Sequence, residues 1–448
     1  MKKARLVARG FLQDDQSDED LYAPVARMPT FRILLAVAVE RDLEIHQLDV
    51  KSAFLNGIPK TTVYMKPPAG LNCAKDSVCL LKKSLYGLRH GSKDWYDCFH
   101  IFITEKIGLT RSKSDPCLYY NDKLSLLVWV DDILLFSKIK TEIKRVKKLF
   151  SDRFEMKDLT HPTHFTFLGL EIERTKDCIF VSQKGLIEKI LKRFNMENSN
   201  PKDIPISPGL NLEIGSNPDS NVPYRELIGS LMYIMMGTRA DLCYAVSYFS
   251  QFQTCYTETH WNHLKNVLRY VNGTKNLGLT FKKRNLDVFD LVAYSDADFG
   301  SDINDRKSIS GFAIMFNGNL VAWKSKKQVT QALSTAESEY VALALCITEC
   351  LFLKYLIEYA FDYTSKLDPI TVYEDNQSAI KIALTLETKR SKHIDVKHHF
   401  IRELIAQDKF KLVYIPSSEQ IADLMTKALV KKTFLYLRAL LGVNEAPC

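Results

Sequence analysis

The chain has 448 residues, of which 46% are hydrophobic and 25% charged, and its formal net charge is +8. This length predicts about two to four globular domains, and no apolar run is long enough to span a membrane. The ten cysteines are scattered, with no Cys-x-x-Cys pair, which argues against a disulfide framework or a zinc knuckle and favours a reducing, intracellular setting. The basic charge is compatible with nucleic-acid binding and does not require it.

The first half of the chain alternates predicted helices and strands. Apolar periodicity, with Pro29 at one helix start and Gly108 at one helix end, predicts helices over residues 29–42, 94–108, 141–150 and 186–194. Residues 47–55 favour a strand, and residues 124–137 predict a hairpin with two acids at its turn. A segment rich in Asn, Pro, Ser and Gly at residues 198–223 is the best linker candidate.

The second half begins with a helical block at residues 224–271 and then changes character. Asn317-Gly318 joins two apolar runs and predicts a tight hairpin. A predicted strand over 290–298 precedes this hairpin. The elements predicted after the hairpin are, in chain order, a helix over 334–359, a strand over 370–375, a helix over 376–384, a strand over 411–416 and a closing helix over 417–429. Three antiparallel strands followed by alternating helices and strands predict a layered domain with a mixed sheet.

Four acids of this last domain fall where its elements meet, namely Asp296, Glu337, Asp375 and Asp423. Converging carboxylates repel one another unless divalent cations neutralise them, and hard oxygen ligands suit Mg²⁺ or Mn²⁺. Two such ions can activate water for attack on a phosphodiester. Each acid also has an ordinary structural interpretation: Ser334-x-x-Glu337 is a capping box, Asp375 can cap the next helix, and Asp423 can lie on the surface.

A second set of acids lies in the first half of the chain. Asp49 is in the predicted strand of residues 47–55, and Asp131 and Asp132 interrupt the apolar run LLVWVDDILLFSK. Burying unpaired carboxylates in such a run is costly. If the two strands are neighbours, the three acids converge and can hold two Mg²⁺ ions at a nucleotide and a primer 3′-hydroxyl. An ordinary polar hairpin turn is the alternative.

These motifs follow the order of a known family. QLDVKSAFLNG, LKKSLYGL, VWVDDILLFS, YRELIGSLMYI, YSDADFGSD, STAESEYVAL, DNQSAI and ADLMTKAL together closely resemble the reverse transcriptase–RNase H portion of the Pol polyprotein of copia-type LTR retrotransposons. The resemblance runs through nearly the whole chain. It implies an α+β and α/β multidomain fold, in which a palm–fingers–thumb polymerase is followed by an RNase H-like mixed-sheet domain. The implied domains are polymerase fingers and palm over 1–200, thumb and connection over 201–285, and RNase H over 286–448.

The resemblance also implies roles for individual residues. Asp49, Asp131 and Asp132 would be the metal ligands and catalytic acids of the polymerase, and Asp296, Glu337, Asp375 and Asp423 those of the RNase H. Phe54 would lie under the incoming sugar and exclude a 2′-hydroxyl; its ordinary alternative is a core position. The segment after LYGL would place Arg89, His90 and Gly91 near the templating base and nucleotide. The implied cofactor is Mg²⁺ or Mn²⁺.

The implied reaction is template-directed addition of dNTPs to a DNA primer, with RNase H cleavage of the RNA–DNA hybrid. The expected partners are RNA template, primer, hybrid and other element-encoded proteins, without a membrane, in cytoplasmic virus-like particles or in the nucleus. Some positions depart from the family pattern: Trp129 stands for a usual Tyr, and Arg89-His90-Gly91-Ser92 lacks the usual Gln and Pro.

The start of the chain lacks a further fingers segment, so we expect a fragment or a decayed copy of an element. The alternatives are a nuclease without polymerase activity and an inactive nucleic-acid-binding remnant.

Overall fold

The computed structural model describes residues 6–13, 21–215, 222–286, 288–361, 367, 369–384 and 395–446, without the side chains of 395–399. The chain divides into two compact units. The first comprises residues 1–30, 43–162 and 359–362, and the second residues 31–42, 163–358 and 363–448. The predicted domain boundaries near residues 200 and 285 therefore lie inside the second unit.

The first unit is built on an antiparallel sheet in the order β4-β5-β6-β7-β1-β8. Its strands are β1 (Glu44–Val50), β4 (Thr110–Arg111), β5 (Leu118–Tyr120), β6 (Ser125–Trp129), β7 (Asp132–Ser137) and β8 (Met156–Asp158). A separate ribbon pairs β2 (Tyr64–Met65) with β3 (Cys79–Leu80). The central strands β6 and β7 are buried over most of their length, as expected for a continuous apolar run inside a sheet.

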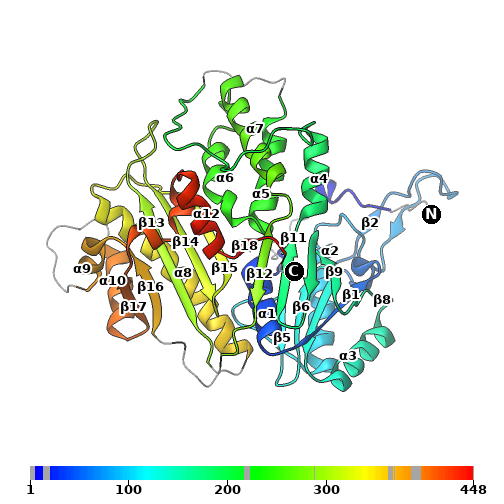
Figure 1. The fold of residues 1–448 in the computed structure, drawn as a ribbon. Helices are drawn as coiled ribbons and strands as arrows, with labels where there is room; N and C mark the ends of the chain where they lie inside the picture. The colour runs from blue at the N-terminus through cyan, green and yellow to red at the C-terminus, as the bar shows by residue number, and fades with distance from the viewer. Residues whose placement is uncertain are drawn as a thin grey trace. The chain divides into compact units, whose positions relative to one another are not determined.

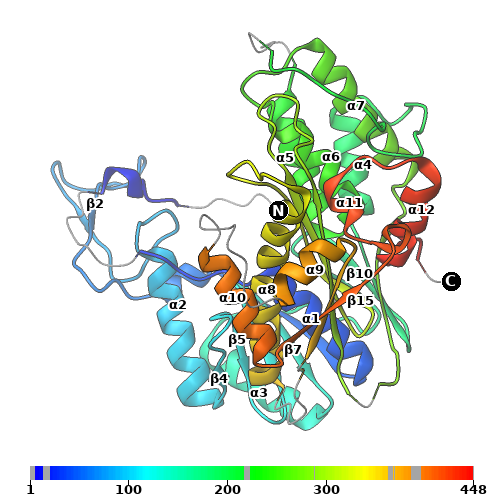
Figure 2. The same ribbon diagram turned by 90° about the vertical axis from the view of Figure 1, so that its left-hand side faces the viewer.

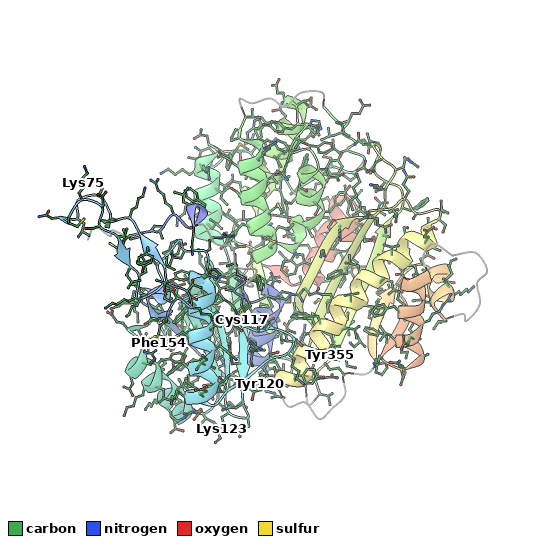
Figure 3. All side chains as sticks on the ribbon, turned by 180° about the vertical axis from the view of Figure 1, so that it is seen from behind. Lys75, Cys117, Tyr120, Lys123, Phe154 and Tyr355 are labelled. Atoms are coloured by element: carbon green, nitrogen blue, oxygen red, sulfur yellow. The ribbon has the colours of Figure 1, made fainter. Side chains whose placement is uncertain are left out.

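Two helices of the first unit bury apolar faces. In α3 (Lys140–Arg153) the predicted stripe of Ile143, Val146 and Phe150 is buried. Helix α2 (Gly91–Ile101) continues as a π-helix, η3 (Phe102–Ile107), and ends at a left-handed glycine as predicted. Phe154, labelled in Figure 3, follows α3. Its ring packs edge-on against Trp95 of α2, with ring centroids 5.5 Å apart. These contacts fix α2, which carries residues of the candidate site.

The second unit contains two sheets. One is antiparallel in the order β18-β12-β11-β10-β9, with strands β9 (His164–Phe167), β10 (Leu170–Arg174), β11 (Cys178–Ser182), β12 (Gly278–Lys282) and β18 (Val443–Asn444). Its helices include α1 (Met28–Glu40, of which residues 31–40 belong to this unit), α4 (Lys184–Arg193), α5 (Tyr224–Gly237), α6 (Cys243–Ser250) and α7 (Glu258–Gly273). In Figure 1, helices α4 to α7 lie together as one bundle. Arg239 is fully buried there and forms a salt bridge with Asp241, in which Nη2 lies 2.8 Å from Oδ2.

The other sheet confirms the predicted mixed layer, in the order β15-β14-β13-β16-β17. Strands β13 (Leu291–Asp298), β14 (Ile309–Phe316) and β15 (Asn319–Lys327) are antiparallel, and β16 (Ile370–Glu374) and β17 (Phe410–Tyr414) join in parallel. Asn317 and Gly318 both have positive φ, at 50° and 65°, as the predicted hairpin turn requires. Helix α8 (Thr335–Ala360) runs across this sheet, and α9 (Gln377–Leu384) and α10 (Asp395–Ala406) lie near its parallel edge (Figures 1 and 2).

The predicted closing helix over 417–429 is wrong in its length. A short 3-10 turn, η5 (Ser417–Glu419), and a single helical turn, α11 (Asp423–Thr426), take its place, and a separate helix, α12 (Lys431–Leu440), follows. Gln420, between the two turns, has an extended backbone, and its side chain donates a hydrogen bond of 2.9 Å to the Ser295 carbonyl of β13. Tertiary contacts here override helix propensity.

By length and composition alone α8 could cross a membrane, and 61% of its most apolar window is buried inside the protein. Core helices of soluble proteins pass the same test, so this is weak evidence for a membrane span.

Taken together, the separate sheets and their registers confirm the predicted class, an α+β and α/β multidomain chain.

Candidate active sites

The three acids of the first unit converge at one end of its sheet. Asp132 is the first residue of β7 and lies directly opposite Asp49 of the neighbouring strand β1. Asp131 occupies the turn before it, and its carbonyl accepts a hydrogen bond of 2.9 Å from Val50 N of β1. Burial and the charges of Asp131 and Asp49 raise the pKa of Asp132 to about 6. The two strands are neighbours, which is the condition under which the three acids were expected to converge, and the acids interact electrostatically.

The turn that presents these acids is strained and supported. Val130 has a φ of 58°, a conformation that β-branched residues rarely adopt. The indole Nε1 of Trp95 donates a hydrogen bond of 2.7 Å to the Val130 carbonyl. Trp95 is buried in the aromatic cluster of α2, so this helix holds the turn from outside the hairpin. The apolar pattern of residues 124–137 did not predict this hydrogen bond from Trp95, which lies far from the hairpin in the sequence.

Phe54 lies close to the LYGL segment. It belongs to a short 3-10 turn, η2 (Ala53–Asn56), that follows β1, and its ring packs edge-on against Tyr86 with centroids 5.1 Å apart. Tyr86 is exposed and Phe54 half-buried, so the pair forms a partly open aromatic surface rather than a core contact. The backbone around Gly87 is close to the N-terminal segment, with Gly10 N donating to the Gly87 carbonyl at 2.9 Å.

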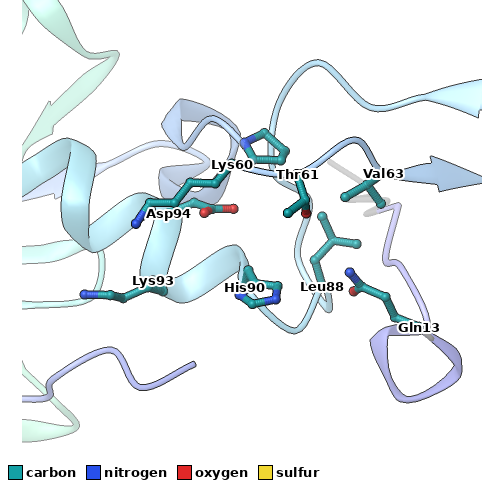
Figure 4. Close-up of a pocket in the computed structure, with 9 residues that line it drawn as sticks. Gln13, Lys60, Thr61, Val63, Leu88, His90, Lys93 and Asp94 are labelled. Atoms are coloured by element: carbon teal, nitrogen blue, oxygen red, sulfur yellow. The ribbon is translucent and has the colours of Figure 1, made fainter. Parts of the chain in front are cut away.

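The three residues after LYGL occupy different positions. Arg89 is exposed, His90 is the residue before α2, and Gly91 is the buried first residue of α2, where an added Cβ would lie 2.9 Å from the Leu85 carbonyl. Figure 4 shows His90 lining a pocket of about 230 Å³. The lining combines polar and charged side chains with apolar ones, namely Gln13, Lys60, Thr61, Lys93 and Asp94 with Pro59, Val63 and Leu88. Both lysines of the lining also pair with Asp97, at 3.1 and 2.9 Å. Gly91 is thus a packing position, whereas His90 lines the pocket.

The second unit holds a tighter cluster of acids. Side-chain oxygens of Asp296 on β13, Glu339 on α8 and Asp375 after β16 all lie within 4.8 Å of one another. Asp423, at the first turn of α11, interacts with Asp296 and is itself buried. Gly311 on β14 lies opposite Asp296 and leaves room for α11, because an added Cβ would be 2.6 Å from Met425 and Thr426. Four separate elements therefore deliver these acids to one place.

Glu337 does not belong to this cluster, and its predicted role as a ligand is corrected to Glu339. The Glu337 carboxylate accepts a hydrogen bond of 2.8 Å from Leu333 N, and its own N–H donates to Ser334 Oγ at 3.2 Å. The bond to Ser334 is one half of the capping box named as its alternative, and the carboxylate accepts from the residue before the cap, so Glu337 satisfies backbone donors at the start of the helix. Residues two apart on a helix point about 200° apart, so Glu337 and Glu339 cannot both face the sheet.

The electrostatics of the cluster are those of acids crowded together out of water. Burial, followed by the charges of Glu374, Asp296 and Asp375, raises the pKa of Glu339 to about 11. Burial and the charge of Asp296 raise the pKa of Asp423 to about 8. Burial also raises the pKa of Asp296, although Lys427 and a hydrogen bond from Thr426 Oγ1 counteract it.

The residues present fit a divalent cation. The Glu339 Oε2 atom is buried and has no hydrogen-bond partner among the described residues, although it stands in a cluster of hard oxygen donors. A carboxylate oxygen buried without a partner is costly, and a bound cation would remove that cost. Asp296, Glu339 and Asp375 are therefore suited to hold Mg²⁺ or Mn²⁺, with Asp423 beside them.

Comparison with known proteins shows what the chain is similar to. Residues 1–208 match the model of the reverse transcriptase (RNA-dependent DNA polymerase) family. Over 99% of its length the chain is 37% identical to the retrovirus-related Pol polyprotein from transposon TNT 1-94 of Nicotiana tabacum. It is 36% identical, over the same share, to that from transposon RE1 of Arabidopsis thaliana. Over nearly its whole length the chain is therefore similar to the Pol polyproteins of plant copia-type transposons.

The chain covers 34% of the tobacco relative and 30% of the Arabidopsis one, or about a third of their length. Among solved structures, a foamy viral protease–reverse transcriptase in complex with double-stranded DNA is 12% identical. Its TM-score is 0.48, over 83% of this chain and 56% of that one. At this level of similarity, the fold assignment rests on the strand order and register described above.

Proposed function

We propose that this Pol segment is an RNA-directed DNA polymerase joined to a ribonuclease H. The polymerase would extend a primer with dNTPs on an RNA or DNA template. The observation that carries the proposal is the presence of two separate carboxylate sites, one at the β6–β7 turn and one at the end of β13. Each site combines acids that repel one another, which is the arrangement that divalent-cation sites need.

In the polymerase site, Asp49, Asp131 and Asp132 would hold the cations, preferably Mg²⁺. When bound there, the cations would neutralise triphosphate charge and lower the pKa of the attacking hydroxyl. The chain's own contribution is positioning: the cross-strand register sets Asp49 against Asp132, and Trp95 holds the turn. The Phe54–Tyr86 pair would contact the sugar of the incoming nucleotide, and His90, Lys60 and Lys93 favour contacts with a phosphate backbone.

In the ribonuclease site, Asp296, Glu339 and Asp375 would hold the cations, with Asp423 as the fourth acid. Thr426 and Ser417 orient two of these carboxylates, because Thr426 Oγ1 donates to Asp296 and Ser417 Oγ donates to Asp375 at 2.5 Å. The expected substrate is the RNA strand of an RNA–DNA hybrid. Binding through phosphate contacts would weaken steeply with salt.

The proposal is tested by two assays on the purified chain with Mg²⁺: primer extension on an RNA template, and cleavage of a labelled RNA–DNA hybrid. Asp131→Asn should abolish extension and spare cleavage. Asp296→Asn should abolish cleavage and spare extension. This crossed result would establish two independent sites, and each variant is the control for the other.

Cleavage without extension in the unaltered chain would favour the second candidate, a nuclease beside an inactive polymerase. The residues Arg89 to Ser92, which depart from the family pattern at the start of α2, are the observation in its favour. Absence of both activities would leave an inactive nucleic-acid-binding remnant and overturn the proposal.

A further inference from the structure

A lysine lies directly against the acids of the ribonuclease site. Lys427 follows α11, and its Nζ atom is 2.8 Å from Asp423 Oδ1 and 3.8 Å from Asp296 Oδ2. The two acid side chains are 7% and 2% exposed, whereas that of Lys427 is 35% exposed. The ammonium group therefore reaches buried carboxylates from a partly open side of the site.

The lysine is held in this position by its surroundings. The preceding residue, Thr426, donates a hydrogen bond to Asp296, and α11 lies over Gly311, which has no side chain to push it away. An ordinary surface ion pair has two solvated partners and little effect. Lys427 instead pairs with two buried acids of the proposed cation site. Its charge lowers the pKa of Asp296, Glu339 and Asp423.

We propose that Lys427 is a tethered counter-cation of the ribonuclease site, a positioning residue that shares Asp423 and Asp296 with the divalent cation and so weakens its binding. The inference rests on the proposed function, because it concerns the same site. Without a divalent cation, the ammonium group holds the carboxylates together against their repulsion. With one present, the two positive charges compete for the same oxygens, which sets the concentration of Mg²⁺ that the site requires.

The test measures cation binding directly, apart from catalysis. The full chain carrying Asp131→Asn and Asp132→Asn would serve as background, so that the ribonuclease site dominates. Mn²⁺ binding would be followed by electron paramagnetic resonance. Lys427→Met keeps the length of the side chain and removes its charge, and it should bind Mn²⁺ about tenfold more tightly. Lys427→Arg keeps the charge and should stay within about threefold of the background.

A parallel readout is the Mg²⁺ concentration that gives half-maximal hybrid cleavage, which should fall about tenfold in Lys427→Met. Unchanged Mn²⁺ affinity in Lys427→Met would overturn the inference. A raised KM for hybrid with unchanged Mn²⁺ affinity would also overturn it, and would make Lys427 a contact to the phosphate backbone. If Lys427→Met does not fold, Lys427→Gln carries the same test.

The proposed function fails in a distinguishable way. In that case the background protein itself would show no Mn²⁺ binding that Asp296→Asn removes. If such binding is present but the Lys427 variants bind Mn²⁺ as tightly as the background protein, the proposed ribonuclease site is supported and the proposed role of the lysine is wrong.

Discussion

The two carboxylate sites are built in opposite ways. The acids of the proposed polymerase site come from one hairpin turn and the strand beside it, so three of the chain's acids meet through ordinary cross-strand pairing. The acids of the proposed ribonuclease site come from the ends of two strands, a long helix and a single helical turn. A site made by pairing depends on register, whereas a site made by convergence depends on the packing of distant elements.

The electrostatic difference follows from this construction. In the turn, which stays partly solvated, the pKa of Asp132 rises to about 6. In the convergent site, burial and like charges raise the pKa of Glu339 to about 11 and that of Asp423 to about 8. The convergent site therefore needs compensating positive charge more strongly, and it is the one that has Lys427 beside it.

The largest expected effect separates the two glutamates at the start of α8. Glu339→Gln removes a charge from the centre of the acid cluster and should lower hybrid cleavage on the order of a hundredfold or more. Glu337→Gln, two residues away, changes only the cap and should keep cleavage within about twofold, with at most about 1 kcal/mol of stability lost. Initial cleavage rates at saturating Mg²⁺ measure both. Equal losses in the two variants would contradict the assignment of Glu339.

The error at Glu337 shows what sequence patterns could and could not supply. The capping box and the acid ligand lie in one heptapeptide, STAESEY, and the prediction chose the acid in the first turn. Helix phase was the available signal, since Glu339 shares a face with Leu343, Cys346 and Cys350, all of which are buried. An acid on the apolar stripe of a core helix is the one that points into the protein.

Other parts of the site were predictable to different degrees. The hairpin around Asp131 and Asp132 followed from its apolar flanks, and the mixed sheet followed from the order of its elements. The hydrogen bond from Trp95 to the strained Val130 turn, and the approach of α11 to Gly311, depend on tertiary packing between residues far apart in the chain. Local patterns contain no record of such contacts.

A second prediction tests the packing on which the convergent site depends. Gly311→Ala places a Cβ 2.6 Å from Met425 and Thr426, so α11 must shift away from β14. We expect a loss of about 1–3 kcal/mol in stability and a fall in hybrid cleavage, with primer extension unchanged. Denaturant unfolding and the two activity assays measure these effects.

The matched control for that variant is Gly229→Ala in helix α5, where nothing lies within 4 Å of the added Cβ. It should be neutral or stabilise by up to about 1 kcal/mol, because alanine favours helix. If Gly311→Ala behaved like this control, the close approach of α11 would not be what positions Asp423.

A third prediction tests the paired site in the corresponding way. Trp95→Phe removes the hydrogen bond to the Val130 carbonyl while keeping an aromatic ring in the cluster. Primer extension should fall several-fold and stability by about 1 kcal/mol, whereas hybrid cleavage should not change. Trp129→Tyr is the control. It introduces the residue that is usual in the family at this position, so it should leave primer extension intact. If extension fell only in Trp129→Tyr, then Trp129 and not Trp95 would be the residue that supports the turn.

The smallest effect is a pH dependence of stability that comes from the convergent site. A carboxyl whose folded pKa is raised binds its proton more tightly in the native state, so it stabilises at low pH and this contribution is lost as pH rises through the folded pKa. For Asp423 that loss is completed near pH 8, and for Glu339 it continues toward pH 11. Histidines with lowered pKa, such as His46 and His260, act in the opposite direction but finish titrating near their unfolded value of about 6.5.

Between pH 7 and 9 the histidines no longer contribute, but buried thiols such as Cys117 and Cys243, whose pKa burial raises, also lose stability as pH rises. The contribution of the acid is therefore the difference between the unaltered chain and Asp423→Asn. In EDTA the melting temperature should fall across this pH window by a few degrees, at about 2–4 °C per kcal/mol. Asp423→Asn cannot titrate there and should make the profile less steep, while Glu339 still contributes to the slope.

Saturating Mg²⁺ should raise the melting temperature more at pH 9 than at pH 7. The cation binds the ionised carboxylates, which are populated at the higher pH, so a Mg²⁺ effect that is larger at pH 7 would contradict the proposed ligands. Asp131→Asn should leave the slope almost unchanged, because the pKa of Asp132, at about 6, lies below the window.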